Sequence, residues 1–421
     1  MDMTRDLYEL GEIPPLGEVP HHMYAALIRP ERYGLPQDAI KIEVVEVPPV
    51  GPGQVLVMVM AAGINYNGVW ASLGTPVDVI AARQKQGDPH GFHIAGSEGS
   101  GVVWATGEGA TRFRAGEHVV FGGLKWDERA DDIRLGTDPA VSRSQRAWGY
   151  ELNFGTFAQF TVVDEYQLHP KPERLTWEEA SCFLAGGATA YRQLCGWPPH
   201  TVRPGDPVLV WGGSGSLGSM AIQIVDLLGG VPIAVVSAEE KAEHCLRLGA
   251  RGVINRTQFD HWGRLPDHTD TAAYQDWLSG VRAFGRGIWD VLGERRSPRI
   301  VLEHPGQDTL PTSLYVCDNG GMVVTCAGTS GYNGDVDLRF LWMFQKRLQG
   351  SHCANARESR EVTNLVAAGR LDPCLSRTAP FGDIAELHRL IYENAHPPGN
   401  MSVLVNAPEP GMTVLPGEVV R

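Results

Sequence analysis

The chain lacks three features that would each direct it to a particular environment. It has no uninterrupted apolar run near the ~20 residues that a membrane-spanning helix needs. It has no Lys/Arg cluster, and its formal net charge of -13 repels nucleic acid. Its first residues contain early acids and prolines but no apolar core, unlike a signal peptide. We therefore expect a soluble, cytoplasmic protein that binds neither membranes nor nucleic acid.

Cysteine is also scarce, and none occurs before position 182. The odd number and irregular spacing of the cysteines argue against a disulfide framework. We expect reduced and mostly buried thiols at positions 182, 195, 245, 317, 326, 353 and 374. Gly and Pro, by contrast, are abundant without any periodic repeat, which indicates a loop-rich α/β protein.

Two sequence patterns divide the chain. Up to about residue 175, alternating apolar stretches separated by Pro/Gly turns, as in 39–60, predict antiparallel strands. Thr176 is a predicted helix N-cap, and from 206 onward strands and helices alternate as in a doubly wound parallel sheet. The polar stretch 257–298 resembles an insertion, and 399–411 returns to the β-rich pattern. We infer a nucleotide-binding domain inserted into the sequence of a catalytic domain.

The segment "VLVWGGSGSLGS" is the strongest local motif, because an apolar strand runs directly into a glycine-rich turn and a helix follows. A pyrophosphate must approach backbone N–H groups closely at a helix N-terminus, and larger side chains would block it. A glycine string alone is often just a flexible turn, but this context favours a dinucleotide site. Its predicted contacts are Gly212, Gly213, Ser214, Gly215 and Gly218.

The end of the next strand indicates which dinucleotide binds. An NAD-preferring site usually has Asp or Glu there, whereas this strand ends in Ser237, with Lys241 and Arg256 following. A hydroxyl and two cations suit a 2′-phosphate, so we predict NADPH. The alternative is that both cations are ordinary solvated surface charges.

A β-rich first domain followed by this motif resembles the medium-chain dehydrogenase/reductase superfamily. Zinc-dependent members carry a Cys in an early loop and a later Gly-His-Glu triplet, where this chain has "GINYN" and "AGSE". Without thiolate or imidazole at those places, we expect no zinc site and no other metal. The resemblance implies a Rossmann NADPH-binding domain over 181–345 and a GroES-like catalytic domain over 1–180 and 346–421.

The chain more closely resembles the crotonyl-CoA carboxylase/reductases over most of its length. The matching stretches include "GINYNGVWAS", "AWGYELNFG", "VLVWGGSGSLGS", "EHPG" and "LRFLWMFQKRLQGSHCANARE". The resemblance implies that NADPH gives hydride to the β-carbon of an α,β-unsaturated acyl-CoA. The resulting enolate attacks CO2 at its α-carbon and gives an alkylmalonyl-CoA.

The same resemblance assigns a CO2 pocket to Asn67, Tyr150, Glu151 and His352. An amide from Asn67 suits a developing carboxylate, and Glu151 with His352 suits an ordered water. Each also has a structural interpretation: Asn favours turns, and Glu151 with His352 could be an unrelated pair. For the CoA moiety the resemblance suggests Arg339. Lys346 and Arg347 are nearby candidates for its phosphates, or they are ordinary surface charges.

Tyr150 stands where the family has Phe, and its hydroxyl could protonate the enolate. A plain enoyl-CoA or quinone reductase without carboxylation is therefore the alternative function. A non-catalytic NADPH-binding scaffold is a third hypothesis. The resemblance also implies a homodimer or homotetramer.

Overall fold

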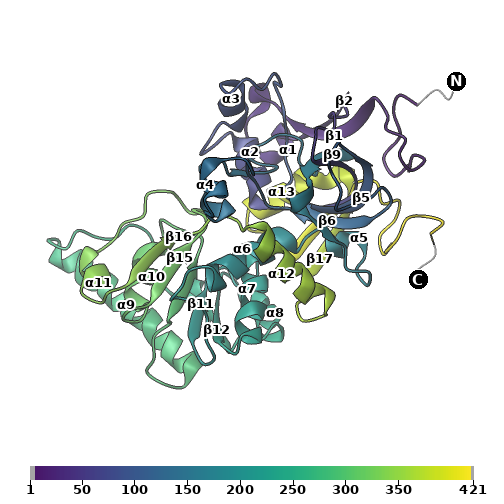
Figure 1. The fold of residues 1–421 in the computed structure, drawn as a ribbon. Helices are drawn as coiled ribbons and strands as arrows, with labels where there is room; N and C mark the ends of the chain where they lie inside the picture. Colours follow the sequence, from purple (N-terminus) through teal and green to yellow (C-terminus); the bar gives the residue numbers. More distant parts are fainter. Residues whose placement is uncertain (1–4, 419–421) are drawn as a thin grey trace. The chain divides into compact units, whose positions relative to one another are not determined.

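The computed structural model describes residues 5–418, which divide into two compact units. Unit 1 comprises residues up to Ala185 and from Ala354 onward, and unit 2 comprises Gly186–Cys353 (Figure 1). The sequence-based boundaries differ at both ends, most clearly near 346. There the chain enters a further strand of the unit 2 sheet, so residues 346–353 go with unit 2. Residues 1–4 and 419–421 of the predicted first domain lie outside the described residues.

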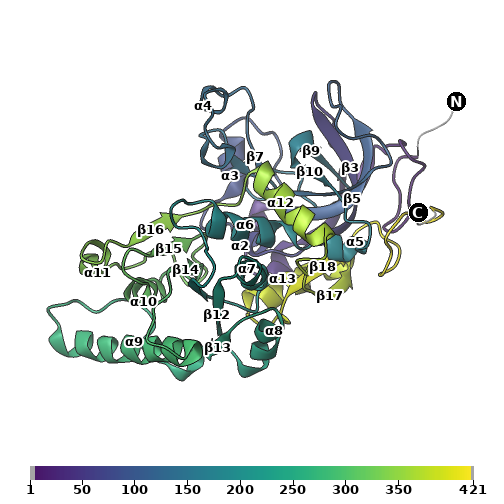
Figure 2. The ribbon, with the colours of Figure 1, turned by 60° about the horizontal axis from the view of Figure 1, so that its bottom comes forward.

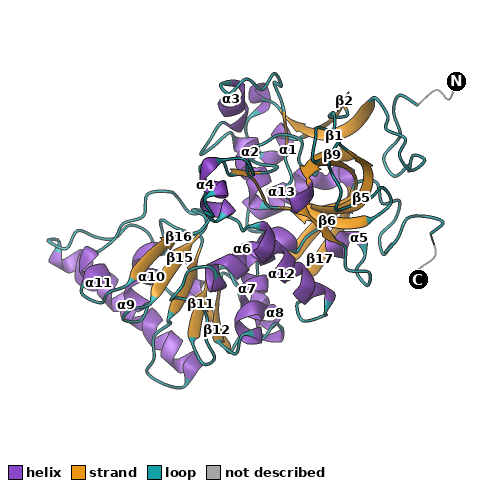
Figure 3. Ribbon diagram, viewed as in Figure 1, coloured by secondary structure: helices purple, strands orange, loops and turns teal. Residues whose placement is uncertain are grey.

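Unit 2 is built on a 6-stranded sheet in the order β13-β12-β11-β14-β15-β16, and all of its neighbouring strands are parallel. This order is that of a Rossmann sheet, which confirms the predicted fold class. Figure 3 shows helices beside both faces of the sheet. The strands are β11 (Pro207–Val210), β12 (Val231–Val236), β13 (Gly252–Asn255), β14 (Ile300–Glu303), β15 (Met322–Thr325) and β16 (Arg347–Gly350).

Apart from α6, which precedes β11, the helices of unit 2 lie between these strands in the sequence. The chain enters the unit along α6, which begins at Leu184. Their bounds are α6 (Leu184–Cys195), α7 (Ser216–Leu227), α8 (Ala242–Arg247), α9 (Thr271–Leu292), α10 (Leu310–Val316) and α11 (Leu338–Trp342), with short 3-10 turns at Glu239–Lys241 and Arg256–Gln258.

The polar stretch 257–298, which the sequence suggests is an insertion, contains the long crossover helix α9 (Figure 2). Asp270 caps its start by accepting from Ala273 N, and Gly293 ends it in the left-handed conformation. Its buried face, which includes Val281 and Phe284, packs into the unit 2 core. The prediction of an insertion is therefore wrong, because the stretch forms the β13–β14 connection that a parallel sheet requires.

Unit 1 is organised around β3 (Gln54–Gly63), which pairs antiparallel with β5, β9 and β18 in a 7-stranded sheet. The stretch 39–60 does form β2 and β3, but they lie in different sheets, since β2 pairs with β1. The other strands are β1 (His22–Ile28), β2 (Lys41–Glu46), β4 (His93–Ile94), β5 (Glu98–Thr106), β6 (His118–Gly122), β7 (Leu124–Lys125), β8 (Arg146–Ala147), β9 (Phe160–Asp164), β10 (Leu168–Pro170), β17 (Leu375–Pro380) and β18 (Asn400–Leu404).

Short helices surround this sheet. Thr176 begins α5 as predicted, since its side chain accepts from Glu179 N in a capping box. The helices of unit 1 are α1 (Pro36–Ala39), α2 (Tyr66–Leu73), α3 (Val79–Gln84), α4 (Asp131–Arg134), α5 (Trp177–Ala180), α12 (Ala356–Ala367) and α13 (Ile384–Tyr392), with 3-10 turns at Pro30–Arg32, Pro139–Val141, Glu165–Gln167 and Phe381–Asp383.

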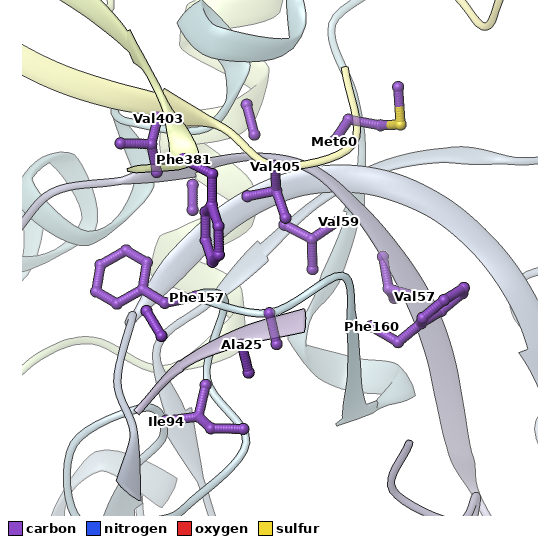
Figure 4. Packing of buried hydrophobic residues seen from close by; sticks show 14 of the residues in the cluster. Ala25, Val57, Val59, Met60, Ile94, Phe157, Phe160, Phe381, Val403 and Val405 are labelled. Atoms are coloured by element: carbon purple, nitrogen blue, oxygen red, sulfur yellow. The ribbon is translucent and has the colours of Figure 1, made fainter. Parts of the chain in front are cut away.

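The core of unit 1 joins side chains from both ends of the chain (Figure 4). Val57 and Val59 of β3 pack in one cluster with Phe157, Phe160 and Val403, and all of them are buried. Each such side chain contributes roughly 1.5–3 kcal/mol by leaving water. This core fixes the end of β3, from which the functional loop of unit 1 emerges.

Within residues 5–418, none of the helices combines the length and the apolar character that crossing a bilayer requires.

Candidate functional site

The glycine-rich turn of unit 2 joins β11 to α7 and is packed too tightly for side chains. Gly212 has a φ of +57°, and a Cβ on it would meet His304 Nε2 at 2.3 Å. A Cβ on Gly218 would meet Gly212 O at 2.2 Å. Gly213 is also enclosed, because its Cβ would lie 2.8 Å from Ala234 Cβ. These glycines are needed for the close strand–helix packing of a dinucleotide-binding turn.

Gly215 differs from the other glycines of the turn. It is the N-cap of α7, and a Cβ there would have only Gly212 O, at 3.5 Å, as a protein neighbour. The space beside it is therefore open, whereas the protein side is held by Gly215 N donating to Gly212 O. An open N-terminus of a twelve-residue helix is what a pyrophosphate needs, so these residues fit a dinucleotide.

Of the predicted 2′-phosphate contacts, Ser237 and Lys241 follow β12, and Arg256 follows β13, which pairs parallel with β12. Lys241 Nζ donates to Ser237 Oγ at 3.4 Å. Burial lowers the pKa of Lys241, the Glu240 charge opposes this, and the positive charge of Arg256 lowers it further. Two cations beside one hydroxyl form a site of positive potential, which favours a bound anion. The charges of Lys241 and Arg256 suit a phosphate, and their contact with the 2′-phosphate stays a prediction.

His304, in "EHPG", is partly buried beside the glycine-rich turn. Its Nε2 lies 3.2 Å from the Trp211 carbonyl oxygen, to which it donates. Burial lowers its pKa to about 4, so the ring is neutral at pH 7. It supports the turn rather than presenting a charge to a ligand.

In unit 1, Asn67 lies in the first turn of α2, directly after β3. Its Nδ2 donates to Ser97 Oγ at 3.0 Å, which leaves its second N–H for a ligand. Asn65 Nδ2 donates to Glu98 Oε1 at 2.8 Å. The "GINYN" loop is therefore held by two consecutive residues of the "AGSE" stretch.

Tyr150 and Glu151 lie in the turn after β8. Glu151 Oε2 accepts from Ala147 N at 2.6 Å, which fixes the carboxylate against its own turn. The Tyr150 ring packs against Trp70 of α2, with centroids 6.2 Å apart. Tyr150 therefore lies beside the helix that carries Asn67.

The sequence reasoning missed several residues of this region. Trp70 and Tyr66 stack edge to face on α2 with centroids 5.1 Å apart, and their i,i+4 spacing in "NYNGVW" is a signal that could have found them. Glu98 is fully buried, and burial raises its pKa to about 7. Its partner lies 33 positions away, so no local pattern indicates this contact.

His352, the fourth predicted residue of the CO2 pocket, lies in unit 2 just after β16. Asn67, Tyr150 and Glu151 lie in unit 1. The structure thus groups the first three in one unit, and a joint action with His352 stays a prediction.

The three candidate CoA contacts have different surroundings. Arg339 at the start of α11 is half-exposed and pairs with Asp337. Lys346 is buried, and its Nζ donates to the carbonyls of Leu314 at 2.7 Å and Tyr315 at 3.1 Å. The ammonium thus satisfies the last carbonyls of α10, which argues against the predicted contact of Lys346 with a CoA phosphate.

Arg347 is similarly engaged within unit 2. It donates to the carbonyls of Trp197 and Pro198, both at 3.3 Å. These contacts give Arg347 a structural explanation, and its contact with CoA stays a prediction, as does that of Arg339.

No group of three or more His, Cys, Asp or Glu side chains that could hold a metal ion occurs within residues 5–418. All seven cysteines are free thiols.

Comparison with known proteins places these features in a family. Residues 51–173 match the family described as "Alcohol dehydrogenase GroES-like domain", and residues 216–368 match "Zinc-binding dehydrogenase". The crotonyl-CoA carboxylase/reductase of Cereibacter sphaeroides is 49% identical over 408 residues, covering 97% of this chain and 93% of the relative.

Two solved structures are similar throughout. The crotonyl-CoA carboxylase/reductase AntE in complex with NADP has a TM-score of 0.93 and 67% identity, covering 96% of this chain and 100% of that chain. The 2-octenoyl-CoA carboxylase reductase CinF in complex with NADP and 2-octenoyl-CoA has a TM-score of 0.85 and 36% identity, covering 94% and 91%. The chain belongs to the crotonyl-CoA carboxylase/reductase family, within the medium-chain dehydrogenase/reductase superfamily.

Proposed function

We propose that this protein catalyses the NADPH-dependent reductive carboxylation of an α,β-unsaturated acyl-CoA to an alkylmalonyl-CoA. The observation that carries the proposal is the placement of Asn67 in unit 1. Its amide is fixed by Ser97 with one N–H left for a ligand, in a chain that is 49% identical to a crotonyl-CoA carboxylase/reductase.

NADPH, when bound, supplies the hydride that reduces the β-carbon of the enoyl thioester. The open N-terminus of α7 at Gly215 would hold its pyrophosphate. Lys241 and Arg256 would hold its 2′-phosphate, with Ser237 as a hydrogen-bond partner.

Asn67 is proposed to donate to a CO2 oxygen as carboxylate charge develops on it. Glu151 and His352 are proposed to hold a water for the other oxygen, and Tyr150 with Trp70 to keep bulk water from the enolate. CO2 offers few contacts, so donors fixed before it arrives must select it over water.

The test is NADPH oxidation over a panel of enoyl-CoAs of increasing chain length, with and without bicarbonate and carbonic anhydrase, followed by product masses. We expect a product heavier by one CO2 when bicarbonate is present. If saturated acyl-CoA is the product at saturating CO2, the protein is a reductase and the proposal fails.

Tyr150 favours the alternative of an enoyl-CoA reductase without carboxylation, because its hydroxyl is a possible proton source close to α2. Tyr150→Phe distinguishes the two. A variant with a raised carboxylated fraction would identify Tyr150 as a proton donor, and an unchanged product ratio would restrict it to excluding water.

Three further features belong to the proposal. Arg339 is half-exposed and is proposed to contact CoA.

The seven free thiols favour a reducing compartment, and we propose that the enzyme acts in the cytoplasm. We also propose that it acts as a homodimer or homotetramer. Size-exclusion chromatography with light scattering tests the oligomeric state.

A further inference from the structure

Glu98 is a fully buried carboxylate that the proposed reaction does not use. It lies at the first position of β5, and both of its oxygens accept hydrogen bonds. Oε1 accepts from Asn65 Nδ2 and Oε2 from Ala185 N, each at 2.8 Å. One side chain therefore joins the entrance of α2 to the first turn of α6. A buried carboxylate costs free energy unless donors surround it, so this contact needs an explanation.

The space around Glu98 is shaped to receive it. A Cβ on Gly63, the last residue of β3, would lie 2.8 Å from Glu98 Cγ and 2.9 Å from Oε1. A Cβ on Gly122 of β6 would lie 3.1 Å from Glu98 Cα. Two glycines from neighbouring strands thus let the carboxylate approach the loop. The contact is built from several elements rather than from one exposed side chain.

Asn65 is used in an unusual way. It occupies the N-cap position of α2, where Asn normally accepts from the backbone of its own helix. Here its side chain makes no capping bond and donates to Glu98 instead. The start of α2 is therefore fixed by β5. Two positions later, Asn67 donates to Ser97, the residue before Glu98.

We propose that Glu98 is a positioning residue, which holds the Asn65 entrance of α2 so that Asn67 keeps its amide directed at CO2. This inference rests on the proposed carboxylation. Glu98 does not touch the substrate and acts through Asn65 and the first turn of α2. Its loss should impair capture of CO2 more than hydride transfer, because reduction of the β-carbon does not need the Asn67 amide.

The experiment uses Glu98→Gln in the full chain. The variant keeps the side-chain volume but places an N–H donor where either the Asn65 amide or the Ala185 N–H now points. Glu178→Gln is the matched control, because Glu178 is also a buried carboxylate of unit 1 but accepts from Gly411 N and not from Asn65. Should Glu98→Gln fail to fold, Asn65→Ala removes the other half of the same bond from a half-buried position.

Two measurements are made on the parent and the variants. The first is the fraction of carboxylated product, with kcat and the KM for CO2. The second is amide hydrogen exchange over residues 63–73. For Glu98→Gln we expect the KM for CO2 to rise at least about fivefold, the carboxylated fraction to fall, and exchange in the first turn of α2 to quicken. Glu178→Gln should resemble the parent in both, and NADPH affinity should be unchanged in all variants.

The outcomes separate the two ideas. Unchanged exchange in Glu98→Gln and Asn65→Ala overturns the positioning role, whatever the products. Faster exchange with an unchanged KM for CO2, in a parent that carboxylates, also overturns it. A parent that forms no carboxylated product defeats the proposed function instead, and the exchange data alone then decide whether Glu98 holds the loop.

Discussion

Unit 2 and unit 1 each pack a glycine next to their predicted site residues against a histidine, but the histidine is held differently in each unit. In unit 2 a Cβ on Gly212 would meet His304 Nε2 at 2.3 Å, and in unit 1 a Cβ on Gly68 would meet His388 Nε2 at 2.2 Å. His388 is buried and His304 is partly buried, and desolvation lowers the pKa of each to about 4. His304, however, donates to the turn itself at Trp211 O, whereas His388 bonds through Nδ1 to Ile384 O of its own helix.

This difference indicates how each half tolerates change. The glycine-rich turn is fixed by backbone conformation and by a hydrogen bond, so it has little freedom to adjust. The helix α2 packs against His388 without a hydrogen bond to it. Asn65 and Asn67, at the start of this helix, are held by the side chains of Glu98 and Ser97. We therefore expect the turn of unit 2 to be most sensitive to substitutions that change its backbone conformation. We expect α2 of unit 1 to be most sensitive to substitutions of the side chains that hold it.

The largest effect is expected for Gly218→Ala. Its Cβ would meet backbone atoms of the turn, Gly212 O at 2.2 Å and Gly213 Cα at 2.6 Å, and neither can rotate away. We expect the Kd for NADPH, followed by its fluorescence, to rise roughly 100-fold, equivalent to about 2.8 kcal/mol. Gly285→Ala in α9 is the control, since its Cβ would only touch Val316 at 3.9 Å. Binding within a factor of about two of the parent would show that the turn can adjust after all.

Acid should weaken both halves. His304 and His388 have pKa values of about 4 in the folded protein, below the ordinary value of 6.5, so the fold favours their neutral forms. Their stabilisation is present above pH 6.5 and is lost as the pH falls through about 4, with an upper limit of about 3 kcal/mol each. Glu98, with a raised pKa of about 7, acts in the opposite direction between pH 4.5 and 7.

Calorimetry between pH 4.5 and 7.5 tests this expectation. The melting temperature of the parent should fall on acidification. In His388→Gln the melting temperature of unit 1 should change less steeply with pH. His21→Gln, at an exposed position of the same unit, is the control. A slope that His388→Gln leaves unaltered would show that other groups cause the acid sensitivity.

A smaller effect is expected at the 2′-phosphate site. Replacing Lys241 by Ala removes one of two cations, and hydrogen bonds to charged groups are worth ~1.5–3 kcal/mol. We expect NADPH to bind about 10- to 100-fold more weakly while NADH binding is nearly unchanged. Arg251→Ala, at an exposed position of the same unit, controls for loss of one positive charge. Equal weakening of both cofactors would assign Lys241 a purely structural role.

The glycine-rich turn of unit 2 could be predicted from the sequence as a local structure, whereas the contacts that hold the loop of unit 1 could not, for a physical reason. The glycine turn is a local arrangement, in which strand, glycines and helix follow one another in the chain, so its pattern can be read directly. The Asn65–Glu98 contact joins residues 33 positions apart, and Glu98 resembles any other strand-edge acid in the sequence. The contact of Lys346 with α10 could not be predicted for the same reason, because it depends on tertiary packing.

The most discriminating comparison is between Gly68→Ala and Gly212→Ala, each with and without removal of its histidine. Gly68→Ala should cost about 1–3 kcal/mol in unfolding free energy by overpacking. It should also lower the carboxylated fraction, because α2 carries Asn67. Adding His388→Ala makes room for the new methyl group, so the double variant should recover at least about 1 kcal/mol, as coupled neighbours do. Gly382→Ala, which would meet no atom within 4 Å, is the control.

Gly212→Ala should not be rescued in this way by His304→Ala. The φ of +57° at Gly212 strains any residue with a Cβ by about 1–2 kcal/mol, even when space is available. Removing His304 also leaves the Trp211 carbonyl without its donor. Denaturant unfolding of the four variants and two double variants measures both cycles. If removal of the histidine restored the same unfolding free energy in both units, steric overlap alone would govern both glycines. The proposed difference between the turn of unit 2 and α2 of unit 1 would then be wrong.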